Sequence, residues 1–377
     1  MHKIKSPEIS GEIDRIIERL LGAIERRISS EGNEKGLELD FGDLMAHFTT
    51  DVVFSCFYGQ RDQINFDGQR NHHVVYADIG FEAMMSKIVE IAKMLPSLAP
   101  VFDFIASNFH PAGKTRRTLI DFIKRQTKLN FEARKLRAKG IESSAGNGSQ
   151  LPAVGKRCVV DTFIDAYHEG KLSHDEYVHS SFFFYFAASK TTADSIALTA
   201  YFLAKHEDVQ DKLRDSIMRE GLDSEYLGWC INESMRLQPP SLVGCARTLT
   251  SDLKLGNVKI PKGTLVTTPA YTIHRLREYW GPDANVFRPE RFANAKDFHP
   301  VQFLPFGAGK RSCPGKDFAY FEARKTLVAL MTKYKFEVCD RTCDTLLFKA
   351  PFSIMTIYKD PIYLRLSYID QSPSTKM

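Results

Sequence analysis

The 377-residue sequence lacks the patterns that define several large classes of protein. Its longest apolar run, Phe182–Ala188, falls far short of the roughly eighteen residues that a membrane span needs, so no transmembrane segment is predicted within it. No secretory signal opens the chain, because Met1-His-Lys-Ile-Lys is followed by polar residues. The seven cysteines are odd in number and form no Cys-x-x-Cys pair, which favours a reducing, cytosol-facing setting over a disulfide or zinc framework.

The net charge of +5 is modest, and much of the basic excess lies between residues 114 and 139. That stretch contains ten Lys or Arg residues against Asp121 and Glu132. A solvated helix face explains the pattern, and so does contact with anionic lipid at a membrane surface or with an acidic protein. No recognised nucleic-acid-binding motif accompanies the patch, so nucleic acid is not an expected partner.

What is present indicates a globular, mostly helical chain that can bury a sizeable core, with 43% hydrophobic and 26% charged residues. Periodic isoleucines and leucines predict helices within residues 7–60. The capping box Ser173–Glu176 predicts a helix over 174–205, whose apolar middle, 182–188, is expected to be buried on every side. Residues 140–157 are rich in Gly and Ser and predict a flexible loop.

Strand patterns are confined to the second half of the sequence. A hairpin is predicted over Leu253–Ile260, with its turn at Gly256-Asn257, and a short strand follows at Thr264–Val266. Two further runs, Phe352–Tyr358 and Ile362–Tyr368, predict a terminal hairpin. The fold class that follows is mainly α with a small β component.

The most informative stretch is ten residues long and reads Phe306-Gly-Ala-Gly-Lys-Arg-Ser-Cys-Pro-Gly315. It sets Cys313 in a Gly-rich turn directly before a helix-forming run, where loop amides and the positive end of the helix favour a thiolate. Such a thiolate is a nucleophile or a metal ligand; the alternative is a buried structural cysteine. Three glycines permit positive φ angles and let a flat ligand approach the backbone: Gly307, Gly309 and Gly315.

The spacing Phe-x-x-Gly-x-Arg-x-Cys-x-Gly resembles the haem-binding loop of the cytochrome P-450 family, the haem-thiolate monooxygenases, in their microsomal eukaryotic type. The resemblance implies that Cys313 is the axial ligand to the iron of haem b, in a loop shaped by Phe306 and the three glycines. It also implies that Arg311 and Arg247 hold the haem propionates, which suits the fixed charge and planar donors of arginine. For Arg247, an ordinary charge at a strand edge is the alternative.

The order of the other motifs resembles the same family. Glu233-Ser-Met-Arg236 precedes Phe287-Arg-Pro-Glu-Arg-Phe292, which precedes the cysteine loop. The resemblance implies an ion-pair cluster of Glu233, Arg236 and Arg291 that braces the loop and has a structural role. Spacing alone means little, because Glu-x-x-Arg also occurs at Glu12–Arg15.

The long helix contains Ala187-Ala-Ser-Lys-Thr-Thr192, where the family has Ala-Gly-x-acid-Thr-Thr at the oxygen face of the haem. Thr191 matches the threonine that helps to deliver protons there. Ala188 replaces the glycine, and Lys190 replaces the acid and either alters the proton relay or pairs with Asp194. The substrate pocket that the resemblance implies is lined by Phe184, Ala188, Leu242, Val243 and Phe352.

The resemblance extends from about residue 5 to about residue 368, and it implies one haem-thiolate domain over 1–377 that is partial at its N-terminus. The family's anchor, first helices and much of its small sheet are expected upstream. The family's Trp-x-x-x-Arg motif is missing, because neither Trp229 nor Trp280 has an arginine four residues on.

The resemblance implies insertion of one oxygen atom from dioxygen into a small apolar substrate. Electrons are expected from NADPH through a reductase, at the cytosolic face of the endoplasmic reticulum membrane. Two alternatives stay open. One is a haem-thiolate isomerase or dehydratase of peroxides, which Lys190 favours, and the other is a non-catalytic truncated remnant, which the missing Trp-x-x-x-Arg motif favours.

Overall fold

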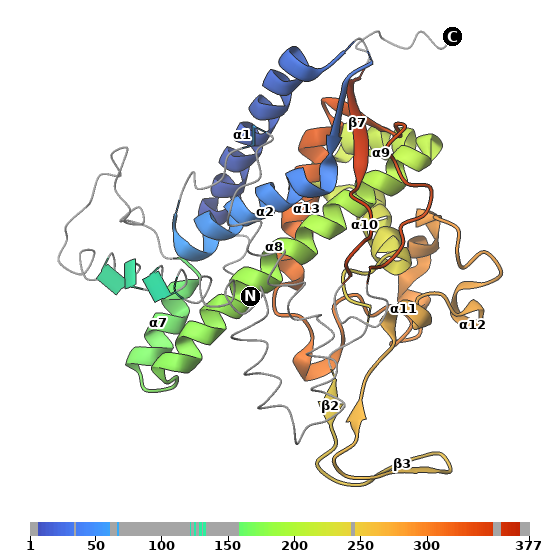
Figure 1. Cartoon of the computed structure of the whole chain (residues 1–377). Coiled ribbons are helices and arrows are strands. Elements are labelled where there is room, and N and C mark those ends of the chain that lie inside the picture. The colour runs from blue at the N-terminus through green and yellow to red at the C-terminus, as the bar shows by residue number, and fades with distance from the viewer. Residues whose placement is uncertain are drawn as a thin grey trace.

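A long central helix organises the molecule, shown as a computed structural model in Figure 1. Helix α8, His174–Lys205, begins and ends where the sequence predicts, and Ser173 and Glu176 form the expected capping box. Around it pack α2 (Phe41–Tyr58), α7 (Val160–His168), α9 (Glu207–Glu220), α10 (Glu225–Leu237) and α13 (Lys316–Met331). The structure describes residues 7–33, 35–60, 66–67, 121, 124–125, 128–129, 131–132, 158–242, 246–349 and 356–369.

The N-terminal part contains helices, as predicted, but a strand interrupts them. Helix α1, Pro7–Glu31, buries a stripe of isoleucines and leucines against α2 and α13. Strand β1, Leu37–Asp40, then precedes α2, whose first turn is capped by the Asp40 carboxylate accepting from the Asp43 amide at 3.0 Å. The prediction of helices over 7–60 was therefore wrong at 37–40, because these alternating residues pair with a distant strand.

A three-stranded antiparallel sheet has the order β1-β7-β6, with β6 over Tyr334–Glu337 and β7 over Tyr363–Tyr368. The predicted strand at 362–368 is confirmed to within one residue. Its predicted hairpin partner is wrong, because β7 pairs with β1 and β6 and buries Leu364 and Leu366 between them. Residues 350–355 of the other predicted run lie outside the described residues.

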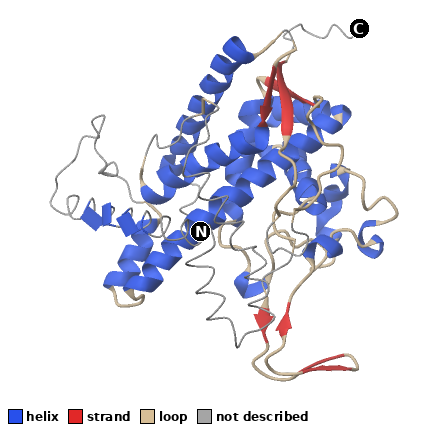
Figure 2. Cartoon of the chain, viewed as in Figure 1, coloured by secondary structure: helices blue, strands red, loops and turns tan. Residues whose placement is uncertain are grey.

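Two smaller strand pairs lie at the bottom of the view in Figures 1 and 2, whereas the three-stranded sheet lies at the top. Strand β2, Arg247–Thr248, pairs with β5, Leu265–Val266, and β3, Leu253–Leu255, pairs with β4, Val258–Ile260. The β3–β4 hairpin turns at Gly256, whose φ of 57° confirms the predicted turn. The remaining short helices are η2 (Gly221–Asp223), α11 (Ala270–Ile273), α12 (Arg277–Trp280), η3 (Pro289–Asp297) and η4 (Gly309–Arg311).

The mainly helical architecture with a small β component confirms the predicted fold class. The middle of α8 is less enclosed than predicted, because Phe183 is 61% exposed while Tyr185 is fully buried. Within the described residues, no helix combines the length and apolar character that crossing a bilayer requires. The predicted loop at 140–157 lies outside the described residues, as does most of the basic stretch at 114–139.

Candidate functional site

The cysteine loop is a series of tight turns that ends at the start of α13. The Gly307 amide donates to the Leu304 carbonyl at 3.1 Å, and the Cys313 amide donates to the Phe306 carbonyl at 2.8 Å. Gly307 and Gly309 have φ angles of 67° and 72°, a region that favours glycine. The loop therefore depends on its glycines for its backbone path.

Cys313 is exposed at the surface of this loop and lies three residues before α13 begins at Lys316. A Cβ atom added to Gly307 or Gly309 would meet nothing within 4 Å, whereas one on Gly315 would lie 3.8 Å from the Cys313 Sγ. The loop thus presents open space beside an accessible sulfur at a helix N-terminus, which favours the thiolate form. These residues fit a flat group that takes one sulfur ligand, such as haem.

Aromatic and amide side chains connect the cysteine loop to α13 and α10. Phe306 is half-buried, and its ring centroid lies 5.2 Å from that of Tyr320 on α13. The Tyr320 hydroxyl donates to the Asn232 Oδ1 on α10 at 2.5 Å, and burial raises the pKa of Tyr320. Through Tyr320 the cysteine loop is linked to α10.

The structure brings Glu233, Arg236 and Arg291 together in a buried cluster. Arg236 Nε and Nη2 donate to the two Glu233 carboxylate oxygens at 2.6 and 2.7 Å, and neither side chain has any exposed surface. Arg291 Nε donates to Glu233 Oε1 at 3.2 Å. The same oxygen accepts from the Arg288 amide at 2.9 Å, so one carboxylate ties α10 to the η3 segment.

The guanidinium of Arg236 is fully satisfied. Its remaining N–H groups donate to the carbonyls of His274, Ala284 and Val286 at 2.8, 2.6 and 3.2 Å. Arg291 gains a further carboxylate from Asp283, whose Oδ2 lies 2.7 Å from Nη2. Arg291 holds the pKa of Asp283 below its usual range. The sequence reasoning missed Asp283, which belongs to none of the motifs.

His274 is a second residue that sequence reasoning missed. It has no exposed surface, and its Nε2 accepts from the Leu304 amide at 2.8 Å. Burial, together with the charges of Arg236 and Arg275, lowers the pKa of His274 to about 3. A lone histidine without a metal-ligand spacing gives no signal of such a role in the sequence.

On α8, Thr191 and Ala188 are partly buried, and α8 packs against α13, the helix that follows Cys313. The Thr191 hydroxyl donates to the Ala187 carbonyl at 2.7 Å. Lys190 Nζ forms an ion pair with the Asp194 carboxylate, and these side chains are 23% and 6% exposed. Of the two roles open to Lys190, the pairing with Asp194 is therefore the one that the structure shows.

The other expected site residues are dispersed. Arg311 is exposed at the end of η4, and Arg247 is exposed on β2. Phe184 packs against Phe57 and Phe163 with ring centroids 6.3 and 5.1 Å apart. Leu242 is buried, but it is not among the buried core residues against which Phe184 packs. Val243 and Phe352 lie outside the described residues.

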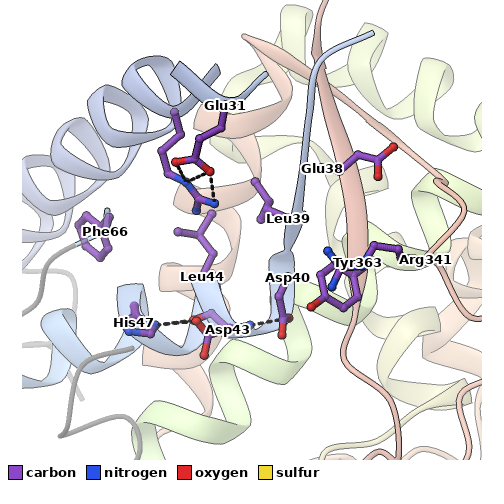
Figure 3. A pocket seen from close by; sticks show the side chains of 11 residues that line it. Glu31, Glu38, Leu39, Asp40, Asp43, Leu44, His47, Phe66, Arg341 and Tyr363 are labelled. Atoms are coloured by element: carbon purple, nitrogen blue, oxygen red, sulfur yellow. Dashed lines mark hydrogen bonds and ion pairs between the residues drawn. The ribbon is translucent and has the colours of Figure 1, made fainter. Parts of the chain in front are cut away.

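A separate cavity of about 310 Å³ lies between α1, α2 and β1. Figure 3 shows acidic, basic and apolar side chains around it; the Asp43 backbone is hydrogen-bonded to His47 through its carbonyl and to the Asp40 carboxylate through its amide. Its lining includes none of the site residues expected from the sequence. We therefore place the candidate site at the cysteine loop and not in this cavity.

Comparison with known proteins agrees with this geometry. The sequence profile of the family described as Cytochrome P450 matches residues 2–364. The chain is 29% identical over 331 residues to rat "Cytochrome P450 3A9", covering 83% of this chain and 62% of the relative. It is 30% identical over 329 residues to dog "Cytochrome P450 3A12", covering 82% and 61%.

A mouse relative, "Cytochrome P450 3A25", is 28% identical over 345 residues, which cover 86% of this chain and 64% of the relative. The chain thus spans less than two thirds of the length of each of these relatives. Because the family profile covers nearly all of the sequence and the cysteine loop has the expected form, the chain belongs to the cytochrome P450 family.

Proposed function

We propose that this chain forms the haem-thiolate part of a monooxygenase that inserts one oxygen atom of dioxygen into a small apolar substrate. The second oxygen atom leaves as water, formed with two electrons from NADPH through a reductase and two protons taken up from solvent. The observation that carries the proposal is the exposed Cys313 in its glycine-dependent loop at the start of α13.

In this proposal Cys313 provides the one protein ligand to haem b, and Arg311 and Arg247 provide cations for its propionates. When bound, haem supplies the reductive activation of dioxygen, which a thiolate ligand promotes. Gly307 and Gly309 leave the face of the loop open, because they add no side chain there. The cluster of Glu233, Arg236 and Arg291 then acts as a structural brace of the loop.

Thr191 is the residue that we assign to proton delivery. Its hydroxyl now donates within α8, and rotation of the side chain would let it donate to a bound ligand and accept from water instead. Lys190 is held by Asp194, so the side chain that replaces the family's acid is engaged within its own helix. We assign Phe184 and Ala188 on α8 to the substrate side, and with them Leu242, which lies in the segment after α10.

Two exposed lysines, Lys310 and Lys316, flank the cysteine and offer positive charge to an acidic surface of a reductase. We place the protein at the cytosolic face of the endoplasmic reticulum membrane, with electrons arriving on this side of the loop. The peroxide isomerase alternative loses the support that Lys190 gave it, because the lysine is paired with Asp194.

The test is a carbon monoxide difference spectrum of the reduced, haem-loaded full chain. The native chain should show the thiolate signature, and Cys313→Ala should abolish it. Cys339→Ala is the matched control, because Cys339 is also partly accessible but lies outside the loop and accepts a hydrogen bond from Thr342, three residues on. A thiolate signature that persists in Cys313→Ala would overturn the assignment. Product formation that depends on NADPH and reductase would separate a monooxygenase from a peroxide isomerase.

A further inference from the structure

Four hydrogen bonds, joined by short stretches of covalent chain, connect the buried ion pair to the cysteine loop. Arg236 Nη1 donates to the His274 carbonyl at 2.8 Å, and the His274 imidazole accepts from the Leu304 amide at 2.8 Å. The Leu304 carbonyl in turn accepts from Gly307, the first glycine of the loop. Two residues beyond Leu304, the Phe306 carbonyl accepts from the Cys313 amide. His274 is the only side chain in this series between the ion pair and the loop.

The hydrogen bond fixes the protonation state of the imidazole. Nε2 can accept from the Leu304 amide only when it carries no proton, so the ring proton of the neutral form is on Nδ1. Within the described part of the chain, Nδ1 has no hydrogen-bond partner, so no second hydrogen bond there favours the opposite tautomer. A protonated ring would place an N–H against the Leu304 N–H.

The surroundings of His274 favour this neutral ring. Phe303 lies beside it, with ring centroids 5.3 Å apart. The charged groups around it are Arg236 on α10 and the neighbouring Arg275, and Glu233 already pairs with Arg236. Burial and these two cations lower the pKa of His274, so that the ring stays neutral at physiological pH.

We propose that His274 is a positioning residue for the cysteine loop: its neutral imidazole, held through its backbone by Arg236, fixes the Leu304 amide and with it the turn that presents Cys313. The inference rests on the proposed haem-thiolate function only for its spectroscopic consequence. The anchoring of Leu304 is a property of the polypeptide and can be measured without haem.

The first experiment observes the native chain. In nitrogen NMR of the full, haem-free chain labelled in histidine, the imidazole of His274 should have an unprotonated Nε2 and a protonated Nδ1. Its signal should be unchanged from pH 8 to about pH 5, well below the usual histidine pKa near 6.5, and it should vanish in His274→Gln. Titration of that signal with an ordinary histidine pKa, or the opposite tautomer, would overturn the proposal.

The second experiment compares variants that differ in acceptor and not only in size. His274→Gln retains an acceptor near the Nε2 position, and His274→Phe keeps a ring without one. In His274→Phe the Leu304 amide should exchange with solvent at least about tenfold faster, the consequence of one lost buried hydrogen bond. His274→Gln should restore most of the protection. His47→Phe removes another buried histidine, in α2, and should leave Leu304 unchanged.

The spectroscopic readout follows on the haem-loaded chains. The fraction of haem with a thiolate signature should fall in His274→Phe and recover in His274→Gln. Equal Leu304 exchange in both variants would overturn the positioning role. If His274→Phe does not fold, the positioning role is tested by the tautomer of His274 in the native chain and by the Leu304 amide exchange in His274→Gln. If the native chain shows no thiolate signature, the proposed function fails, while the exchange and tautomer measurements still test the role of His274.

Discussion

Replacing Glu233 by alanine should destabilise the protein more than any other single carboxylate change in α10. Arg236 has no exposed surface, and the change removes both of its charge-assisted hydrogen bonds. The Arg288 amide loses its acceptor as well, while Arg291 retains Asp283. Leaving a buried charge uncompensated costs about 3–5 kcal/mol. That loss is a large share of the roughly 5–15 kcal/mol that stabilises a typical domain.

The assay is urea denaturation of the full chain followed by circular dichroism, with haem content measured in parallel. The matched control is Glu12→Ala, which breaks a pair of the same i, i+3 spacing with Arg15 on α1. The side chains of Arg15 and Glu12 are 28% and 11% exposed, so water screens this pair, unlike the one at 233, and it should contribute only about 0–1 kcal/mol. Equal denaturation midpoints for the two variants would refute the reasoning that burial gives the pair at 233 its importance.

Three further predictions concern other parts of the chain. Gly307→Ala should destabilise the loop by about 1–2 kcal/mol and lower haem retention because of its positive φ. Gly11→Ala, at an exposed position of helix α1, should instead be neutral or stabilising. Burial raises the pKa of Glu322, so the folded chain holds a proton that the unfolded chain releases near pH 4.5. The free energy of unfolding should therefore fall as pH rises above that value. Glu322→Gln should make the urea midpoint depend less on pH than it does in the native chain. An equally steep pH dependence in the variant would contradict this. A double-mutant cycle with Lys190→Met and Asp194→Asn should give a coupling of about 0.5–3 kcal/mol, and zero coupling would show that the ion pair in α8 contributes nothing.

The sequence alone determined the features that depend on local chemistry. The capping box at Ser173 and Glu176 set the start of α8, because its two hydrogen bonds form within four residues. Gly256 set the turn of the β3–β4 hairpin, because its positive φ suits a residue without a side chain. The spacing around Cys313 indicated a haem-thiolate loop for the same reason, since its glycines, arginine and cysteine lie within ten residues.

Only the tertiary structure decided what depends on residues far apart in the chain. Strand β1 forms because Leu37 and Leu39 meet β7 more than three hundred residues later, and no local periodicity reveals that partner. Lys190 and Asp194 are only four residues apart, so the sequence offered this pair as one of two roles for Lys190, and the structure showed that the pair forms. His274 acquires its importance from the Leu304 amide, thirty residues on. A side chain's role in a buried network depends on which distant backbone groups it satisfies, and the fold alone sets those neighbours.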